Sequence, residues 1–358
     1  MSDLAISDGP ATPGAPLLDV QHLSTRFSVK GKGLFAKRQS LTAVDDVSFF
    51  VREGETLGIV GESGCGKSTL GRSILRLIEP SEGRVVWSGR SLTELSPAEM
   101  RRARRDLSII FQDPIASLDP RMTVGDIIDE PLRVAEPAMT KVERRARIQT
   151  VMGEVGLVPE MINRYPHEFS GGQAQRIGIA RAIVTEPKLI VCDEPVSALD
   201  VSIQAQIVNL LADLRRRRGL TLIFISHDLS VVRLVCDRIL VLYLGRVVEL
   251  GARADVFDRP AHPYARALLS AAPIPDPRIA RHRKRLVLAG DPPSPVNPPS
   301  GCAFRTRCPI AEPICASERP ALRHVAAGHE AACHFAGEEA ARRMRAVEAP
   351  ALAEVAAG

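Results

Sequence analysis

Short apolar runs alternate with longer amphipathic stretches along most of the chain. The apolar runs predict strands at 18–20, 47–51, 56–60, 85–87, 107–111, 189–192, 222–225, 239–242 and 247–250. Apolar residues at helical spacing predict helices at 69–78, 203–214 and 229–235. Strands that are apolar throughout are typical of parallel sheets covered on both faces. The pattern therefore predicts an α/β fold with a largely parallel sheet.

Two stretches depart from this alternation. Residues 123–157 show helical spacing without a strand signal, which predicts a separate helical lobe at about 115–170. A short helix is expected at 265–271. From Pro273 on, prolines become frequent, and little regular structure is expected there. The predicted domains are a disordered N-terminus at 1–16, a core at 17–258, an extension at 259–335 and a frayed or disordered tail at 336–358.

Composition and charge narrow the function classes. The chain has 358 residues, 45% of them hydrophobic, with a net charge of +5. Arginines cluster at 101–105, 215–218 and 281–285; we interpret them as solvated surfaces, with nucleic acid or an anionic membrane as alternatives. Aromatic residues make up 4%, too few for a base-stacking platform, so nucleic acid is not an expected partner.

The chain shows no targeting or membrane-spanning signal. No apolar run approaches the length that crosses a bilayer. The first 16 residues have neither the basic nor the apolar region of a secretion signal. We therefore expect a cytoplasmic protein.

Residues 61–69 form a phosphate-binding loop between a predicted strand and a predicted helix. The loop consists of Gly61, Glu62, Ser63, Gly64, Cys65, Gly66, Lys67, Ser68 and Thr69. Its glycines allow backbone N–H groups to converge on phosphates, and the helix N-terminus adds positive potential. Lys67 supplies a full charge, and the Ser68 hydroxyl is suited to bind Mg²⁺. This segment predicts a nucleoside triphosphate site.

Two further segments carry candidate chemistry. Asp193 and Glu194 follow the buried strand 189–192, at the edge of a parallel sheet where ligands bind. Asp193 is placed to hold Mg²⁺, and Glu194 to polarise an attacking water. Ser170 to Gln173 precede a predicted helix and suggest a second anion-binding helix start; an ordinary capped helix is the alternative that local sequence favours.

These motifs occur in the same order as in the ATP-binding subunits of ABC transporters, which residues 18–255 therefore resemble. Matching positions are Gln112 (Q-loop), Ser170, Gly171, Gly172 and Gln173 (signature), Asp193 (Walker B), Glu194 (catalytic), Asp200 (D-loop), His227 (switch) and Phe27 (adenine stacking). Phe27 and Phe169 stand where Tyr and Leu are more usual, and Ala174 where a basic residue is common. The resemblance implies a P-loop NTPase core with a mixed, largely parallel sheet, an antiparallel β subdomain and a helical lobe.

The resemblance also implies how the site works. ATP would lie between two subunits paired head to tail, held by the phosphate-binding loop of one and the signature of the other. Ser68, Gln112 and Asp193 would bind Mg²⁺, and the catalytic set would be Glu194, His227, Gln112 and Asp200.

Other segments resemble one branch of this family, the oligopeptide and dipeptide importer ATPases. They are His262-Pro263-Tyr264 with the proline-rich tail, Phe111 to Pro114, Ser117 to Pro120, and Ala43 to Ser48. The branch implies peptide uptake at the cytoplasmic face of the membrane, with two permease subunits and, indirectly, a solute-binding protein. It favours a paralogue as the second ATPase subunit and permits a second copy. Alternative functions are import of nickel or glutathione, and a soluble ABC ATPase acting on nucleic acid.

Four cysteines cluster in the predicted extension: Cys302, Cys308, Cys315 and Cys333. Their spacings of five, six and seventeen residues differ from the paired spacing of zinc ribbons and are compatible with a four-thiolate [4Fe–4S] site. The branch resemblance supports the iron–sulfur interpretation. Zinc, with His324, His329 or His334 as a substitute ligand, and free thiols are the alternatives.

Overall fold

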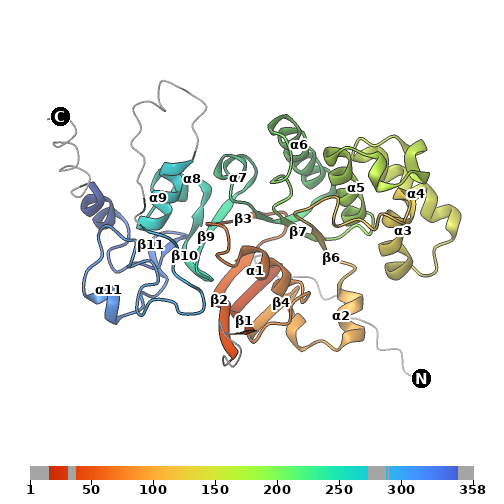
Figure 1. Ribbon diagram of the computed structural model, residues 1–358. Coiled ribbons are helices and arrows are strands. Elements are labelled where there is room, and N and C mark those ends of the chain that lie inside the picture. The colour runs from red at the N-terminus through yellow and green to blue at the C-terminus, as the bar shows by residue number, and fades with distance from the viewer. Residues whose placement is uncertain (1–15, 31–37, 273–287, 289, 346–358) are drawn as a thin grey trace.

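The computed structural model describes residues 16–30, 38–272, 288 and 290–345 (Figure 1). Residues 1–15 of the predicted disordered N-terminus, the arginine cluster at 281–285 and residues 346–358 of the predicted tail lie outside the described residues. Among the helices within the described ranges, none is both long enough and apolar enough to cross a membrane.

An eight-stranded mixed sheet forms the centre of the described chain, in the order β11-β12-β10-β9-β3-β8-β7-β6. Its parallel part consists of β3 (Thr56–Val60), β6 (Leu107–Ile110), β7 (Leu189–Asp193), β8 (Thr221–Ile225) and β9 (Arg238–Tyr243). Every residue of β3, β7 and β8 is buried, because both faces of the sheet are covered. The predicted largely parallel sheet is confirmed.

A second, antiparallel sheet lies on one side of the first. It consists of β1 (Leu18–Lys30), β2 (Arg38–Val51), β4 (Glu82–Trp87) and β5 (Arg90–Ser91), in the order β2-β1-β4-β5. Its apolar residues share one core with β3 and with α1 (Lys67–Ile74). This is the predicted antiparallel subdomain, and in Figure 1 it lies below the central sheet.

Helices cover the opposite face of the central sheet (Figure 1). They are α5 (Gly171–Ile183), α6 (Val201–Arg218), α7 (Leu229–Val235), α8 (Arg253–Asp258) and α9 (Pro263–Ala271). Their apolar residues pack with strand residues such as Phe224 and Val241 in a second core. Two cores on two faces of one sheet hold the strand ends, and the loops that follow them, in fixed places.

The helical lobe consists mainly of α3 (Val124–Ala135) and α4 (Lys141–Glu154), both within the predicted range. Thr123 caps α3, and a capping box of Thr140 and Glu143 begins α4. The two helices pack on each other and on α5, and Figure 1 shows them at the end of the molecule opposite the chain's C-terminus. The lobe is therefore connected to the central sheet through its packing on α5.

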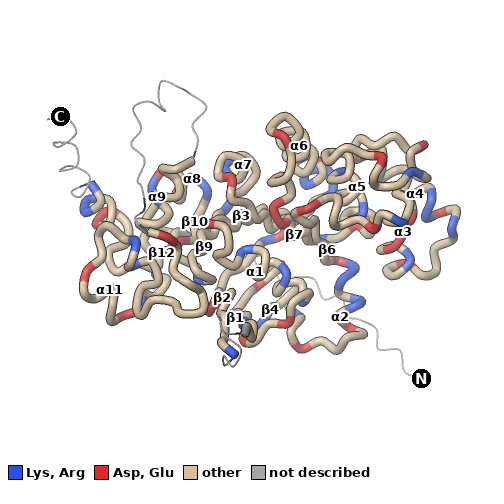
Figure 2. The backbone as a smooth tube through the Cα atoms, viewed as in Figure 1, with Lys and Arg blue, Asp and Glu red and all other residues tan. Residues whose placement is uncertain are grey.

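Several arginines of the clusters within the described residues are paired with acids. Arg215 bonds to Asp237, and Arg218 forms a two-point pair with Glu154. Arg105 contacts Glu136. Figure 2 shows acidic positions distributed near the basic ones. These pairings support the interpretation of solvated surfaces.

The C-terminal extension has more regular structure than its sequence predicts. β11 (Arg323–Ala326) and β12 (His329–Ala331) form a hairpin that continues the central sheet beyond β10 (Arg246–Ala252), and α11 (Ile314–Ser317) is a short helix. Residues 338–345 are helical, and Ala340 and Met344 are buried against Ile310. This part of the predicted frayed tail is therefore packed, because its apolar residues cover the extension.

Candidate nucleotide-binding site

The phosphate-binding loop connects β3 to α1, as predicted. Gly66 has a φ of 105° and is the N-cap of α1, with no side-chain cap. A Cβ atom at Gly66 would lie 2.1 Å from the carbonyl oxygen of Ala43, so this position accepts only glycine. The loop thereby presents the start of α1 to an anion.

A cleft of about 1430 Å³ opens beside this loop. It is lined by the loop residues Ser63 to Thr69 and by more distant residues that the sequence singled out, namely Phe27, Gln112, Glu194 and His227. The Phe27 side chain is partly exposed on the cleft wall, where a ring can stack on a base. The structure thus gathers residues from five separate segments in one cavity.

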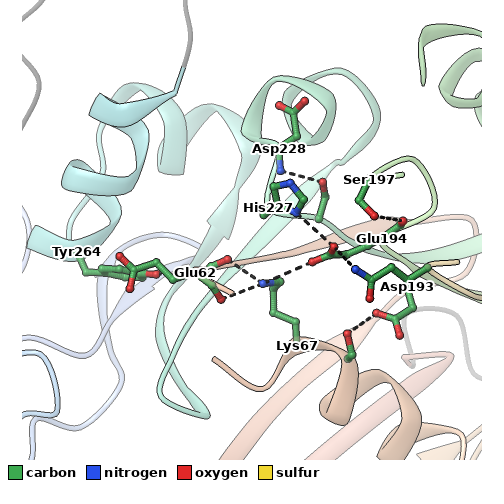
Figure 3. A network of polar contacts seen from close by, with 12 residues as sticks. Glu62, Lys67, Asp193, Glu194, Ser197, His227, Asp228 and Tyr264 are labelled. Carbon is green, nitrogen blue, oxygen red and sulfur yellow. Dashed lines mark hydrogen bonds and ion pairs between the residues drawn. The ribbon is translucent and has the colours of Figure 1, made fainter. Parts of the chain in front are cut away.

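Lys67 is buried at the inner end of the cleft. Its Nζ donates hydrogen bonds to the carbonyl oxygens of Gly61 and Glu62, at 2.9 and 3.0 Å (Figure 3). The same Nζ lies 3.9 Å from Oε1 of Glu194. A full positive charge is therefore held between the loop and the carboxylate.

Asp193 ends β7 and is completely buried. The Ser68 hydroxyl donates to its Oδ1 at 2.6 Å, and Arg72 donates to its Oδ2 at 3.2 Å. Two of the three predicted magnesium ligands therefore meet, and a carboxylate with a hydroxyl suits the oxygen preference of Mg²⁺. Arg72 was missed by the sequence analysis; its place one turn after Ser68 on α1 is the signal that could have found it.

Glu194 has a φ of 48°, a left-handed conformation that is costly for a residue with a side chain. Its N–H donates to the carbonyl oxygen of Ile225 at 3.0 Å, which fixes the backbone. Oε2 accepts a hydrogen bond from Gln112 at 3.0 Å and lies 3.3 Å from Nδ1 of His227 (Figure 3). The carboxylate is oriented into the cleft, where it can accept a proton from water.

His227 follows β8 and has a largely exposed side chain in the cleft. The next residue, Asp228, caps α7 through its side chain, and its N–H donates to the Ser226 hydroxyl. These bonds fix the turn that carries His227. Gln112, the third predicted magnesium ligand, contacts Glu194 through its amide.

Two predicted groups do not join this cleft. At the start of α5, Ser170 and Gln173 form a capping box, with the Ser170 N–H donating to the Gln173 side chain at 3.0 Å. Neither these residues nor Gly171 and Gly172 line the cavity. Asp200 is exposed at the N-cap of α6 and also lies outside it. Any role of these residues in ATP chemistry involves a surface other than the walls of this cleft.

Comparisons with known proteins agree with this geometry. Residues 44–197 match the family described as ABC transporter, and residues 248–315 the oligopeptide/dipeptide transporter C-terminal region. The chain is 56% identical over 319 residues to the oligopeptide transport ATP-binding protein OppF of Haemophilus influenzae, covering 88% of this chain and 96% of that protein. It is 58% identical over 308 residues to OppF of Escherichia coli, covering 86% and 92%. The chain belongs to the ABC transporter ATP-binding family.

Solved structures of the same family match the ATPase core. A dimeric, post-hydrolysis structure of the ATP-binding cassette MJ0796 with ADP and Pi has a TM-score of 0.59 and 31% identity, covering 66% of this chain and 98% of that one. The cassette cbiO1 of Clostridium perfringens has a TM-score of 0.57 and 27% identity, covering 68% and 91%. The ABC ATPase fold is therefore confirmed.

The four cysteines of the extension lie in one region of the described chain. The Cys302 N–H donates to the Cys315 carbonyl at 2.8 Å. Burial raises the pKa of the Cys308 thiol to about 12 and that of Cys333 to about 11, and the neighbouring cysteines act in the same direction. Raised pKa values keep these thiols protonated unless a bound cation lowers them.

Within the described residues, however, no group of three or more His, Cys, Asp or Glu side chains is arranged to hold a metal ion. The histidines considered as substitute zinc ligands already have partners. His329 contacts the buried Glu249 at 2.8 Å, His334 the Glu318 carbonyl, and His324 lies 3.3 Å from Glu330. Among the described residues, the geometry thus gives no support to a metal site in the extension, whether four cysteines form it or a histidine replaces one of them.

Proposed function

We propose that this chain is the ATP-hydrolysing subunit of an importer for di- and oligopeptides. The observation that carries this function is the cleft lined by Lys67, Ser68, Glu194 and His227, with the buried Asp193 bonded to Ser68, in a chain with the oligopeptide transporter C-terminal region. The chain docks at the cytoplasmic face of two membrane-spanning permease subunits. A solute-binding protein outside the membrane delivers the peptide. Import of another cargo, such as nickel or glutathione, is the alternative within the same branch.

Each residue of the cleft has a role that follows from its chemistry. The loop N–H groups and Lys67 bind the phosphates, and Phe27 stacks on the adenine. Ser68 and Asp193 are the residues that would hold Mg²⁺, with Gln112 within reach of the same region; the ion would neutralise phosphate charge. Glu194 polarises the attacking water. His227 orients the water and contacts the terminal phosphate.

The signature residues complete the site in a dimer. Ser170, Gly171, Gly172 and Gln173 would meet the terminal phosphate of the nucleotide bound by a facing ATPase subunit, with Asp200 at the same interface. ATP bridges the two subunits, and hydrolysis removes the phosphate that both contact. A ligand with more contacts in the closed state shifts the population toward that state. The partner is a paralogue in the arrangement that the branch favours.

The role of Glu194 is tested with Glu194→Gln in the assembled importer. We expect ATP to bind as in the wild type, while hydrolysis slows by roughly 10²-fold or more, because the amide cannot accept a proton from water. The matched control is Glu160→Gln, which changes an exposed carboxylate in the helical lobe. Hydrolysis by Glu194→Gln at the wild-type rate would show that Glu194 is not the catalytic base.

We also propose that the four cysteines hold a [4Fe–4S] cluster, with zinc as the alternative metal. The spacing of the four cysteines along the chain and the resemblance to the peptide-importer branch support this donor set. The cluster would stabilise an extension too small to fold on its own. Anaerobic purification of the full chain should yield about four irons and four sulfides per chain with visible absorption, all lost in Cys308→Ser. Stoichiometric zinc, or no metal, in wild-type protein prepared this way would refute the iron–sulfur site.

A further inference from the structure

The C-terminal extension contacts the phosphate-binding loop directly, at Glu62. Nη1 of Arg307 lies 2.7 Å from Oε2 of Glu62, and Nη2 lies 3.0 Å from Oε1. The Arg307 side chain is only 7% exposed, and that of Glu62 is 27% exposed. Two parallel charge-assisted hydrogen bonds fix the orientation of both groups more firmly than a single-point contact would. The pair joins residues that are 245 positions apart.

Glu62 is held at its backbone as well as at its side chain. Its N–H donates to the Tyr264 hydroxyl at 2.9 Å, and its carbonyl oxygen accepts from Lys67 at 3.0 Å. Figure 3 shows Glu62 between Tyr264 of α9 and Lys67 of the loop. One residue of the phosphate-binding loop therefore connects α9 and the extension with the lysine that faces the phosphates.

The position of Arg307 is fixed by the packing of its own segment. Phe304 is almost completely buried, with its ring centre 5.4 Å from that of Tyr264 and 5.3 Å from that of Tyr243. Cys302 and Cys308 flank the segment that contains both Phe304 and Arg307. A contact that fixes the positions of Cys302 and Cys308 therefore also restricts the position of Arg307.

The charge of Glu62 explains why this contact matters for nucleotide binding. A carboxylate in the phosphate-binding loop repels the phosphates of ATP unless a cation offsets it. The hydrogen bonds to Glu62 raise the pKa of Arg307 above its already high value, so the guanidinium stays charged. Removing a cation from a largely buried pair leaves an uncompensated charge, which is costly.

We propose that Arg307 is a positioning residue of the ATP site: it neutralises and orients Glu62, so that the four-cysteine extension sets the affinity of the phosphate-binding loop for nucleotide. This inference rests on the proposed ATP site. Arg307 contacts the loop and does not line the cleft, so it acts on binding and leaves the chemical step unchanged.

The test is ATP affinity of the purified full chain, measured by calorimetry, and kcat and KM for ATP of the assembled importer. Arg307→Met should weaken ATP binding and raise KM roughly tenfold, with kcat within about twofold of wild type. Adding Glu62→Gln to Arg307→Met should restore the affinity to within about threefold of wild type, because the repulsive charge is gone. Arg305→Met is the matched control, since Arg305 bonds to Ser300 within the extension.

Unchanged affinity in Arg307→Met, or no rescue by Glu62→Gln, would overturn the inference. Lys67→Ala tests the ATP site independently of Arg307. If the proposed ATP site is wrong, Lys67→Ala will bind ATP as the wild type does; if only the role of Arg307 is wrong, Lys67→Ala will lose affinity while Arg307→Met will not. Where Arg307→Met does not fold, Arg307→Lys keeps the charge, loses the two-point geometry and should weaken binding about threefold. Cys308→Ser should also weaken ATP binding, and adding Arg307→Met to it should have little further effect; fully additive effects would refute the coupling to the cysteines.

Discussion

Two helices of this chain, α1 and α5, have glycines at or just before their first turn, but their surroundings differ. At α1, Gly66 leaves the helix start without a side-chain cap, and Lys67, Asp193 and Glu194 lie around it. At α5, Ser170 and Gln173 cap the helix themselves, and the segment lies outside the cleft. The start of α1 thus has the charged and polar groups that a triphosphate site needs, whereas the start of α5 lacks them.

The difference indicates that the two helix starts of one chain are suited to different roles. A capped helix start is stable without a ligand, which is compatible with the proposal that α5 meets a phosphate bound by another subunit. An uncapped start beside a lysine leaves N–H groups and positive potential available to an anion. In the proposed function, the chain therefore carries one nearly complete nucleotide site at α1 and one complementary surface at α5.

Lys67→Ala should produce the largest effect, because it removes the full charge at the α1 site. We expect ATP affinity of the full chain to fall by roughly 10²-fold or more, since this cation is desolvated beside the phosphates. Calorimetric titration with MgATP measures the change. The control is Lys141→Ala, which removes an exposed lysine of the helical lobe. Equal ATP affinity in Lys67→Ala and Lys141→Ala would contradict the assignment of the nucleotide site to the start of α1.

Ser170→Asp should produce a smaller effect, confined to the partner's nucleotide. Asp and Asn both cap helices well, so Ser170→Asn is a matched variant that keeps the cap without adding charge. Ser170→Asp should leave ATP binding to the isolated chain within about twofold of wild type, and slow hydrolysis by the assembled importer about tenfold relative to Ser170→Asn. If Ser170→Asp abolished ATP binding by the isolated chain, the start of α5 would belong to the same nucleotide site as α1, which would contradict the difference between the two helix starts.

The sequence predicted the core well because its signals are local. The buried strands are largely apolar, Asp193 ends one of them and His227 lies two residues after another, so their meeting at one sheet edge could be foreseen. The contact between Gln112 and Glu194 follows in the same way, although they are 82 residues apart.

The extension was predicted less well. The strands β11 and β12 are short and lack a clear apolar alternation, and a hairpin that pairs with β10 depends on the sheet already being formed. The pair Arg307–Glu62 has no local signal at all. Arrangements that depend on docking one folded part against another cannot be inferred from spacing along a single chain.

The central claim is that ATP hydrolysis at the α1 site drives peptide uptake. Its most direct test is ATP hydrolysis by the complete importer in lipid vesicles, measured with and without transported peptide and its solute-binding protein. The account predicts that peptide stimulates hydrolysis with the wild-type chain, and that Glu194→Gln abolishes the stimulated activity while ATP still binds. Hydrolysis that ignores peptide, or that persists unchanged with Glu194→Gln, would contradict it.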